Sequence, residues 1–239
     1  FEYMDKGDLA HFLQENASSH QNHNSNPIGV HERTESSISN DPPQLSCDQL
    51  TDVCKQIASG MDYLSKKNHI HRDLACRNCL VSAPLNVKIG DFGMSQNLYT
   101  RDYYRVNGKA VLPIRWMSPE AVVYGKFTIQ SDVWSFGVVM WEVFSFAMQP
   151  YYGVTNEEVS QIIRKGKHLD IPPDCPDKIY EIMSECWNMD PSCRPTFSDL
   201  YAVLLSYHSS TSTDNSPIGG QGLNDTSSLR SNVFSDVAS

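Results

Sequence analysis

The sequence of 239 residues lacks a long apolar run, an excess of basic residues and a glycine period. No apolar stretch approaches the ~18 residues needed to span a bilayer, and the most apolar segment, residues 133–146, is interrupted by Ser135, Gly137 and Glu142. The 13 glycines recur at no fixed interval, which excludes a collagen-like chain. With 19 basic against 28 acidic residues the net charge is −9, which argues against nucleic acid as a main partner.

The cysteine pattern does not resemble a disulfide framework. Seven cysteines, at irregular spacing, favour a reducing compartment, because an odd number cannot pair completely. Cys76-x-x-Cys79 matches half of a zinc or redox site, but no second pair stands at suitable spacing. A metal or redox protein therefore remains only an alternative, and it would require zinc in the purified chain.

Two long polar stretches, residues 17–44 and 208–239, contain few apolar side chains. Neither can bury enough apolar surface to offset the entropy lost on ordering. We therefore expect a disordered internal insertion and a disordered, Ser/Thr-rich tail.

The rest of the chain has mainly helical patterns. Ser46-x-x-Gln49 is a capping box before an apolar face at helical spacing, and Thr196-x-x-Asp199 begins another helix. Residues 131–144 are apolar on every side, which predicts a helix in the centre of the domain. We expect a helix-rich body with a few short strands, at Ile70, residues 80–81 and residues 87–89.

Residues 71–78 read His-Arg-Asp-Leu-Ala-Cys-Arg-Asn, which has the form H-R-D-L-x-x-x-N. Asp-Phe-Gly follows at 91–93, and Ser-Pro-Glu at 118–120. In this order the motifs resemble the catalytic loop and flanking motifs of protein kinases. The resemblance implies an α+β protein kinase-like fold, with only the hinge between the lobes and the mainly α-helical C-lobe present in this chain.

The same resemblance implies a role for each polar residue of these motifs. Asp73 would accept the proton of the attacking hydroxyl, and Arg77 and Asn78 would be the catalytic residues beside it. Asn78 and Asp91 offer hard oxygen ligands for Mg²⁺, or Mn²⁺ in its place, bridging the phosphates of ATP.

Three features resemble tyrosine kinases rather than serine/threonine kinases. Residues 75–77 have the Ala-x-Arg form of tyrosine kinase catalytic loops. Residues 112–117 resemble the tyrosine kinase substrate-binding loop, to which Pro113, Ile114 and Trp116 would belong. The third feature is a set of tyrosines between the Asp-Phe-Gly and Ser-Pro-Glu motifs.

These tyrosines, Tyr99, Tyr103 and Tyr104, resemble the autophosphorylation sites of insulin-receptor-like and Trk-like kinases. They would be regulatory phosphotyrosines, and Arg72 would pair with a phosphate on this segment. Surface aromatics in a loop are the alternative interpretation.

Residues 1–9, Phe-Glu-Tyr-Met-Asp-Lys-Gly-Asp-Leu, resemble the hinge between the kinase lobes. Phe1 would be the gatekeeper, and the backbones of Glu2 and Met4 would face adenine. Asp8 would reach the ribose, and Leu80 would form the floor under the base. The expected units are therefore hinge and first helix at 1–16 and C-lobe at 45–207.

Within the C-lobe, the resemblance also implies two buried polar contacts. Asp132 would hold the backbone of the catalytic loop. Glu120 and Arg194 would form the buried ion pair found across the kinase fold.

Among receptor tyrosine kinases, the chain resembles the Ror family most, with Trk and muscle-specific kinase as near relatives. Residues 102–106, 112–117, 124–127 and 149–153 carry this resemblance. It implies a part of a single-pass receptor on the cytoplasmic side of the plasma membrane. The partners would be ATP, protein tyrosine substrates, phosphotyrosine-binding adaptors and a second receptor in a dimer.

Kinases carry a Gly-rich loop and a Lys–Glu pair before the hinge, and G-x-G-x-x-G does not occur in this sequence. We therefore expect a fragment without the N-lobe that is inactive alone. The alternative is a pseudokinase or phosphotyrosine scaffold. Gln96-Asn97, where relatives usually have Arg-Asp, favours the scaffold, whereas intact Asp73, Asn78 and Asp91 favour the enzyme.

Overall fold

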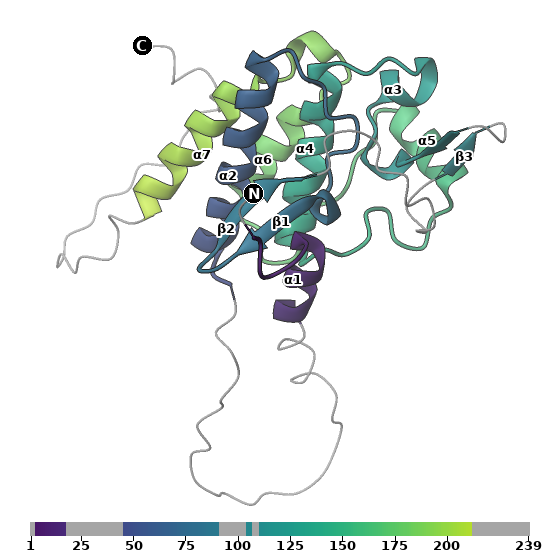
Figure 1. Cartoon of the computed structure of the whole chain (residues 1–239). Helices are drawn as coiled ribbons and strands as arrows, with labels where there is room; N and C mark the ends of the chain where they lie inside the picture. Colours follow the sequence, from purple (N-terminus) through teal and green to yellow (C-terminus); the bar gives the residue numbers. More distant parts are fainter. Residues whose placement is uncertain (1–2, 18–44, 91–103, 107–109, 212–239) are drawn as a thin grey trace, which may run out of the picture.

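The computed structural model describes residues 3–17, 45–90, 104–106 and 110–211 (Figure 1). The expected insertion and tail lie almost entirely outside these ranges, so their disorder stays a prediction. The flanking helices reach slightly into them, because α1 spans Leu9–Ala17 and α7 spans Phe197–Thr211.

Helices form most of the described structure, and the expected helix-rich body is confirmed. Between α1 and α7 lie α2 (Cys47–Lys66), α3 (Pro119–Tyr124), α4 (Ile129–Phe144), α5 (Asn156–Arg164) and α6 (Asp177–Cys186). The 3-10 turns are η2 (Cys76–Asn78), η3 (Ile114–Trp116) and η4 (Pro191–Cys193). Two antiparallel pairs are formed by β1 (Cys79–Ser82) with β2 (Asn86–Ile89), and by β3 (Tyr104–Val106) with β4 (Ala110–Leu112).

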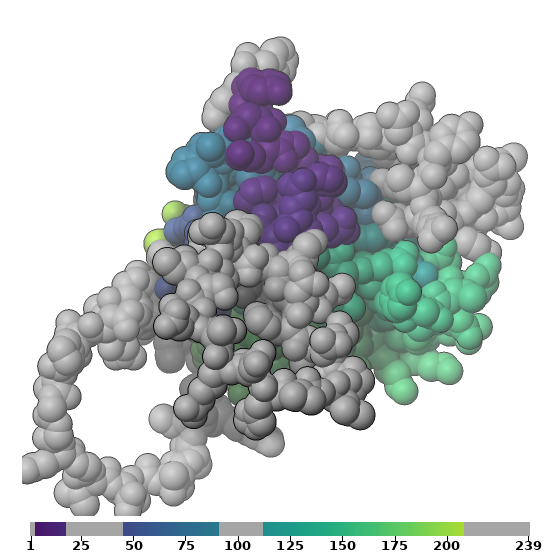
Figure 2. Space-filling model, turned by 90° about the horizontal axis from the view of Figure 1, so that it is seen from below, coloured from purple at the N-terminus to yellow at the C-terminus, as the bar shows by residue number. Residues whose placement is uncertain are grey.

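The β1–β2 hairpin supports the amino-terminal segment. Val81 N donates to Gly7 O at 2.9 Å, Lys6 N donates to Val81 O at 3.0 Å, and Asp8 forms a bridge with Leu80. Figure 2 shows this segment, in purple, lying against the blue part of the chain. The strands expected near residues 80 and 87 are confirmed, whereas Ile70 lies in no strand, so that expectation was wrong.

Helix α2 begins as its sequence predicts. Ser46 Oγ accepts from Gln49 N, and the Gln49 side chain accepts from Ser46 N, which completes the capping box. The apolar face of α2 is buried, and α7 packs along it (Figure 1). Thr196 and Asp199 exchange the corresponding bonds at the start of α7.

Helix α4 is the central buried helix that the sequence predicts. It begins at Ile129, with Thr128 as its N-cap, and nearly all of its side chains are buried. At Gly137, a Cβ would lie 2.7 Å from Trp187 Nε1, so glycine allows the close approach of the chain after α6. The helix also buries polar side chains, namely Asp132, Ser135 and Glu142.

The expected ion pair between Glu120 and Arg194 is confirmed. Arg194 Nη1 and Nη2 donate to the two carboxylate oxygens of Glu120 at 2.6 and 2.9 Å. Burial alone would raise the pKa of Glu120, but the Arg194 guanidinium lowers it below its ordinary value. Since Arg194 is buried, losing its partner should cost about 3–5 kcal/mol.

All seven cysteines are free thiols in this structure. Five are buried (Cys54, Cys76, Cys79, Cys175 and Cys186), Cys47 is partly buried and Cys193 is exposed. Burial raises the pKa of the Cys76 and Cys79 thiols, which disfavours the thiolate needed for redox or metal chemistry.

No helix within the described ranges is both long and apolar enough to cross a membrane.

The backbone at Ala147 yields the first prediction. Ala147 follows α4 with φ of +58°, a left-handed conformation that costs a residue with a Cβ about 1–2 kcal/mol. Changing Ala147→Gly should relieve this strain and leave the free energy of unfolding unchanged or raised by up to about 1 kcal/mol. The matched control, Ala202→Gly inside α7, should lower it by about 1 kcal/mol. Urea unfolding of both variants tests this, and equal losses would contradict it.

Candidate active site

The segment of residues 71–78, called the catalytic loop below, is anchored by a carboxylate of α4. Asp132 accepts from His71 N at 2.7 Å and from Arg72 N at 2.9 Å, as expected. These bonds hold Arg72 at φ of +69°, in the left-handed region. Burial raises the pKa of Asp132 to about 6, although the two N–H donors and Arg72 act in the opposite direction.

The buried His71 ring joins the catalytic loop to the chain just before Asp91. Its Nδ1 accepts from Asp73 N, and its Nε2 lies 3.3 Å from Gly90 O. A neutral ring with its proton on Nε2 satisfies both contacts. The histidine therefore fixes Asp73 relative to residue 90.

The Asp73 carboxylate is paired with a guanidinium that stacks on an aromatic ring. Arg77 Nη2 donates to Asp73 Oδ1 at 2.6 Å. The Arg77 guanidinium carbon lies 4.2 Å from the centre of the Trp116 ring, within the range of a cation–π contact. The structure thus brings together Asp73 and Arg77, two of the three predicted catalytic residues, and adds Trp116 of the substrate loop.

The Asn78 side chain, a predicted metal ligand, is oriented by its own loop. Its Nδ2 donates to Asp73 O at 2.6 Å, so the NH₂ group is committed to the backbone. The amide oxygen is then the atom that can face a cation, and this fits the oxygen ligands that Mg²⁺ prefers. The second predicted ligand, Asp91, lies outside the described residues.

Glu142 of α4 is a site residue that the sequence reasoning missed. Its Oε2 accepts from Cys76 N at 3.1 Å and from Trp116 Nε1 at 2.8 Å. Burial raises the pKa of Glu142 to about 7, although Trp116, Arg77 and Cys76 favour the charged form. An acidic residue within the most apolar segment of the sequence, residues 133–146, was the available signal, because a buried carboxyl requires partners.

With this geometry established, comparisons with known proteins identify the family. A family model described as protein tyrosine and serine/threonine kinase matches residues 1–204. The chain belongs to the protein kinase family. The expected kinase fold is therefore confirmed, and the helical body described above belongs to its C-lobe.

The chain is similar to receptor kinases. The tyrosine-protein kinase transmembrane receptor Ror of Drosophila melanogaster is 46% identical over 211 residues, which cover 87% of this chain and 27% of that protein. The BDNF/NT-3 growth factors receptor of Gallus gallus is 45% identical over 204 residues, covering 85% of this chain and 23% of the receptor. The NT-3 growth factor receptor of Macaca fascicularis is 44% identical over 208 residues, covering 85% and 24%.

The expected resemblance to Ror and Trk receptor tyrosine kinases is thereby confirmed. The chain spans about a quarter of the length of the curated relatives it matches.

In this kinase chain the substrate loop, residues 112–117, is held in place by buried side chains. Pro113, Ile114 and Trp116 are all buried, so these predicted residues support the loop. The sequence reasoning missed the role of Arg115, whose buried guanidinium donates to three backbone carbonyls, Pro150 O, Tyr151 O and Val154 O, at 2.6–2.8 Å. Arg115 therefore fixes the substrate loop against residues 150–154.

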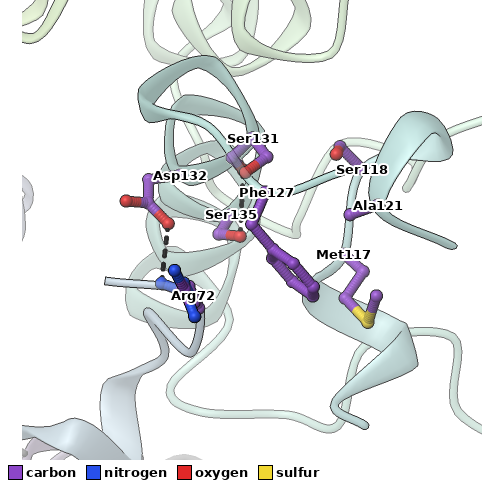
Figure 3. A pocket seen from close by; sticks show the side chains of 8 residues that line it. All are labelled: Arg72, Met117, Ser118, Ala121, Phe127, Ser131, Asp132 and Ser135. Atoms are coloured by element: carbon purple, nitrogen blue, oxygen red, sulfur yellow. Dashed lines mark hydrogen bonds between the residues drawn. The ribbon is translucent and has the colours of Figure 1, made fainter. Parts of the chain in front are cut away.

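A small recess lies between the catalytic loop and the substrate loop (Figure 3). Arg72 and Asp132 border it on one side, and Met117 and Ser118 on the other. Ser135 Oγ donates to Trp116 O at 2.8 Å beside it, which ties α4 to η3. The Arg72 side chain is exposed, and its expected role of pairing with a phosphate stays a prediction.

The residues expected to bind the nucleotide are only partly described. Asp8 and Leu80 are brought together by their bridge, and the apolar Leu80 side chain is 37% exposed. Asp8 Oδ1 accepts from His11 N at 2.9 Å, so one carboxylate oxygen caps α1. Met4 O accepts from Gly7 N in a turn, at 3.4 Å. Glu2 lies outside the described residues.

Of the predicted phosphotyrosines, Tyr99 and Tyr103 lie outside the described residues. Tyr104 is the first residue of β3, and its backbone is paired with Leu112 of β4. Their regulatory role stays a prediction.

The pKa of Asp132 gives the second prediction. A carboxyl with a raised pKa in the folded chain contributes fully to stability below its ordinary pKa of 3.8, and this contribution is lost as the pH rises through about 6. As the pH rises from 4 to 6, the free energy of unfolding should therefore fall less for Asp132→Asn than for wild type. The two slopes should differ by up to about 1.4 kcal/mol per pH unit.

Urea unfolding at several pH values measures this difference. The exposed Asp170→Asn is the control and should follow the wild-type slope. Equal slopes for wild type and Asp132→Asn would show that the pKa of Asp132 is not raised.

Proposed function

We propose that this chain is the C-lobe of a protein tyrosine kinase that transfers the γ-phosphate of ATP to tyrosine in peptides. The observation that carries the proposal is the position of Asp73. The Asp73 backbone is hydrogen-bonded to the side chains of His71 and Asn78, and the Asp73 carboxylate accepts a hydrogen bond from Arg77. A carboxylate held so firmly can orient a hydroxyl and accept its proton, which is the work that phosphoryl transfer leaves to protein side chains.

The surrounding residues would provide binding and orientation. Leu80 presents an exposed apolar surface beside Asp8, which suits a planar base. Asn78 and Asp91 would hold Mg²⁺, which when bound neutralises charge on the ATP phosphates. Arg77 keeps the Asp73 carboxylate in place through its 2.6 Å bond to Oδ1.

Tyrosine specificity is supported by the Arg77–Trp116 stack. The stack joins the Ala-x-Arg pattern of the catalytic loop to the substrate loop in one physical unit. The relatives include a protein named as a tyrosine-protein kinase.

We further propose regulation through Tyr99, Tyr103 and Tyr104, with Arg72 as the partner of a phosphate on that segment. The phosphotyrosines would recruit phosphotyrosine-binding adaptors. The chain would lie on the cytoplasmic side of the plasma membrane, within a single-pass receptor that acts as a dimer. Because the phosphate-positioning Lys–Glu pair belongs to the other lobe, residues 1–239 alone should transfer no phosphate.

The third prediction tests the base. In the full-length kinase that contains this chain, Asp73→Asn should reduce phosphate transfer to a tyrosine peptide by at least about 100-fold, since a positioned base contributes 10²–10⁴-fold. Binding of Mg–ATP and the unfolding transition should stay close to wild type, because Asn preserves the shape of the side chain. Radiolabelled phosphate transfer and nucleotide-binding titration measure these quantities.

The exposed Asp170→Asn serves as the control and should retain wild-type transfer. Activity of Asp73→Asn within tenfold of wild type would show that Asp73 is not the base. A wild-type protein that binds Mg–ATP and transfers nothing would instead support the pseudokinase or scaffold.

A further inference from the structure

Glu142 connects the catalytic loop to the substrate loop through a single buried oxygen. Oε2 accepts both the Cys76 backbone N–H and the Trp116 indole N–H. We propose that Glu142 is a positioning residue for phosphate transfer: it fixes Trp116 and the Cys76 backbone, and through them the Arg77–Asp73 pair. This inference rests on the proposed kinase function and adds a residue to that site.

The connection from Glu142 to Asp73 can be followed contact by contact. The 2.8 Å bond fixes the plane of the Trp116 indole, on which the Arg77 guanidinium lies at 4.2 Å. Arg77 in turn donates to Asp73 Oδ1 at 2.6 Å. The side chains of Arg77 and Asp73 are only 17% and 10% exposed, so little space allows them to rearrange if the ring turns.

The backbone bond provides a second route to the same place. Cys76 begins η2, and its N–H is the donor to Glu142. Arg77 follows Cys76 directly, so the bond sets the point from which the Arg77 side chain leaves the backbone. Both ends of the Arg77 side chain therefore depend on Glu142.

The charge of Glu142 argues for a role beyond packing. A fully buried carboxyl is costly, and an apolar residue would fill the same volume without that cost. The charged and titratable groups near the carboxyl are Arg77, Cys76 and Cys79. Arg77 is the cation among them, so the guanidinium lies in the field of two carboxylates, Asp73 and Glu142, and its orientation is defined by both.

Helix α4 makes this arrangement rigid. Asp132 and Glu142 lie on the same helix, about 15 Å apart along its axis at 1.5 Å per residue. Asp132 holds the start of the catalytic loop, and Glu142 holds its middle. One buried helix thus sets the loop at two points.

The test uses Glu142→Gln, which preserves the shape but removes the charge. In the full-length kinase, assayed at pH 8, this variant should lower kcat about tenfold or more while the KM values for ATP and peptide stay within twofold. Trp116→Phe, which removes the indole N–H together with its five-membered ring but keeps an aromatic face for Arg77, should lower kcat less. The double variant should equal Glu142→Gln alone, because the two residues act as one unit.

Glu181→Gln, exposed on α6, is the matched control and should match wild type. If Glu142→Gln retains kcat within twofold, or if kcat falls only in proportion to the folded fraction of the protein, the proposal is overturned. Additive losses in the double variant would also overturn it, since the two residues would then act independently.

A second measurement separates this inference from the kinase function. In the chain of 239 residues, the NMR resonance of the Trp116 indole N–H should shift in Glu142→Gln, together with that of Arg77 Nε, while the other three indole resonances stay in place. Unchanged Trp116 and Arg77 resonances would overturn the positioning role of Glu142, whatever the kinase activity. If the resonances shift but the wild-type kinase transfers no phosphate, only the proposed function fails.

Discussion

The arrangement of the site depends on the two backbone N–H groups that Asp132 accepts. Arg72 sits in a left-handed conformation that ordinarily costs a residue other than glycine on the order of 1–3 kcal/mol. The carboxylate makes that conformation the favourable one, because both N–H groups would otherwise be left without an acceptor in a buried place. The positions of the later residues of the catalytic loop therefore depend on this turn.

Helix α4 therefore fixes the positions of the loops that carry the candidate site. Its buried polar groups contact the catalytic loop at two points and the substrate loop at η3. An all-apolar helix would be easier to bury, but it would allow many registers against its neighbours. Hydrogen bonds to fixed donors select one register, and the resulting geometry extends to Asp73.

Local features were predictable from the sequence because local physics determines them. The capping boxes at Ser46 and Thr196 and the burial of residues 131–144 follow from spacing alone. The contacts of Asp132 and the Glu120–Arg194 pair followed from family resemblance, which encodes tertiary contacts that no pattern contains. Ile70 was wrong as a strand because an isolated apolar residue has no partner in a sheet. Glu142 and Arg115 were missed because their partners lie 26–66 and 35–39 residues away in the sequence.

The distribution of thiols has a practical consequence. Cys193 is exposed, whereas Cys76 and Cys79 are buried on either side of Arg77 and Asn78. A thiol reagent would thus mark the surface of the native chain at Cys193 and reach the catalytic loop only when that loop opens. The rate at which the buried Cys76 thiol reacts would then report how often the loop leaves α4.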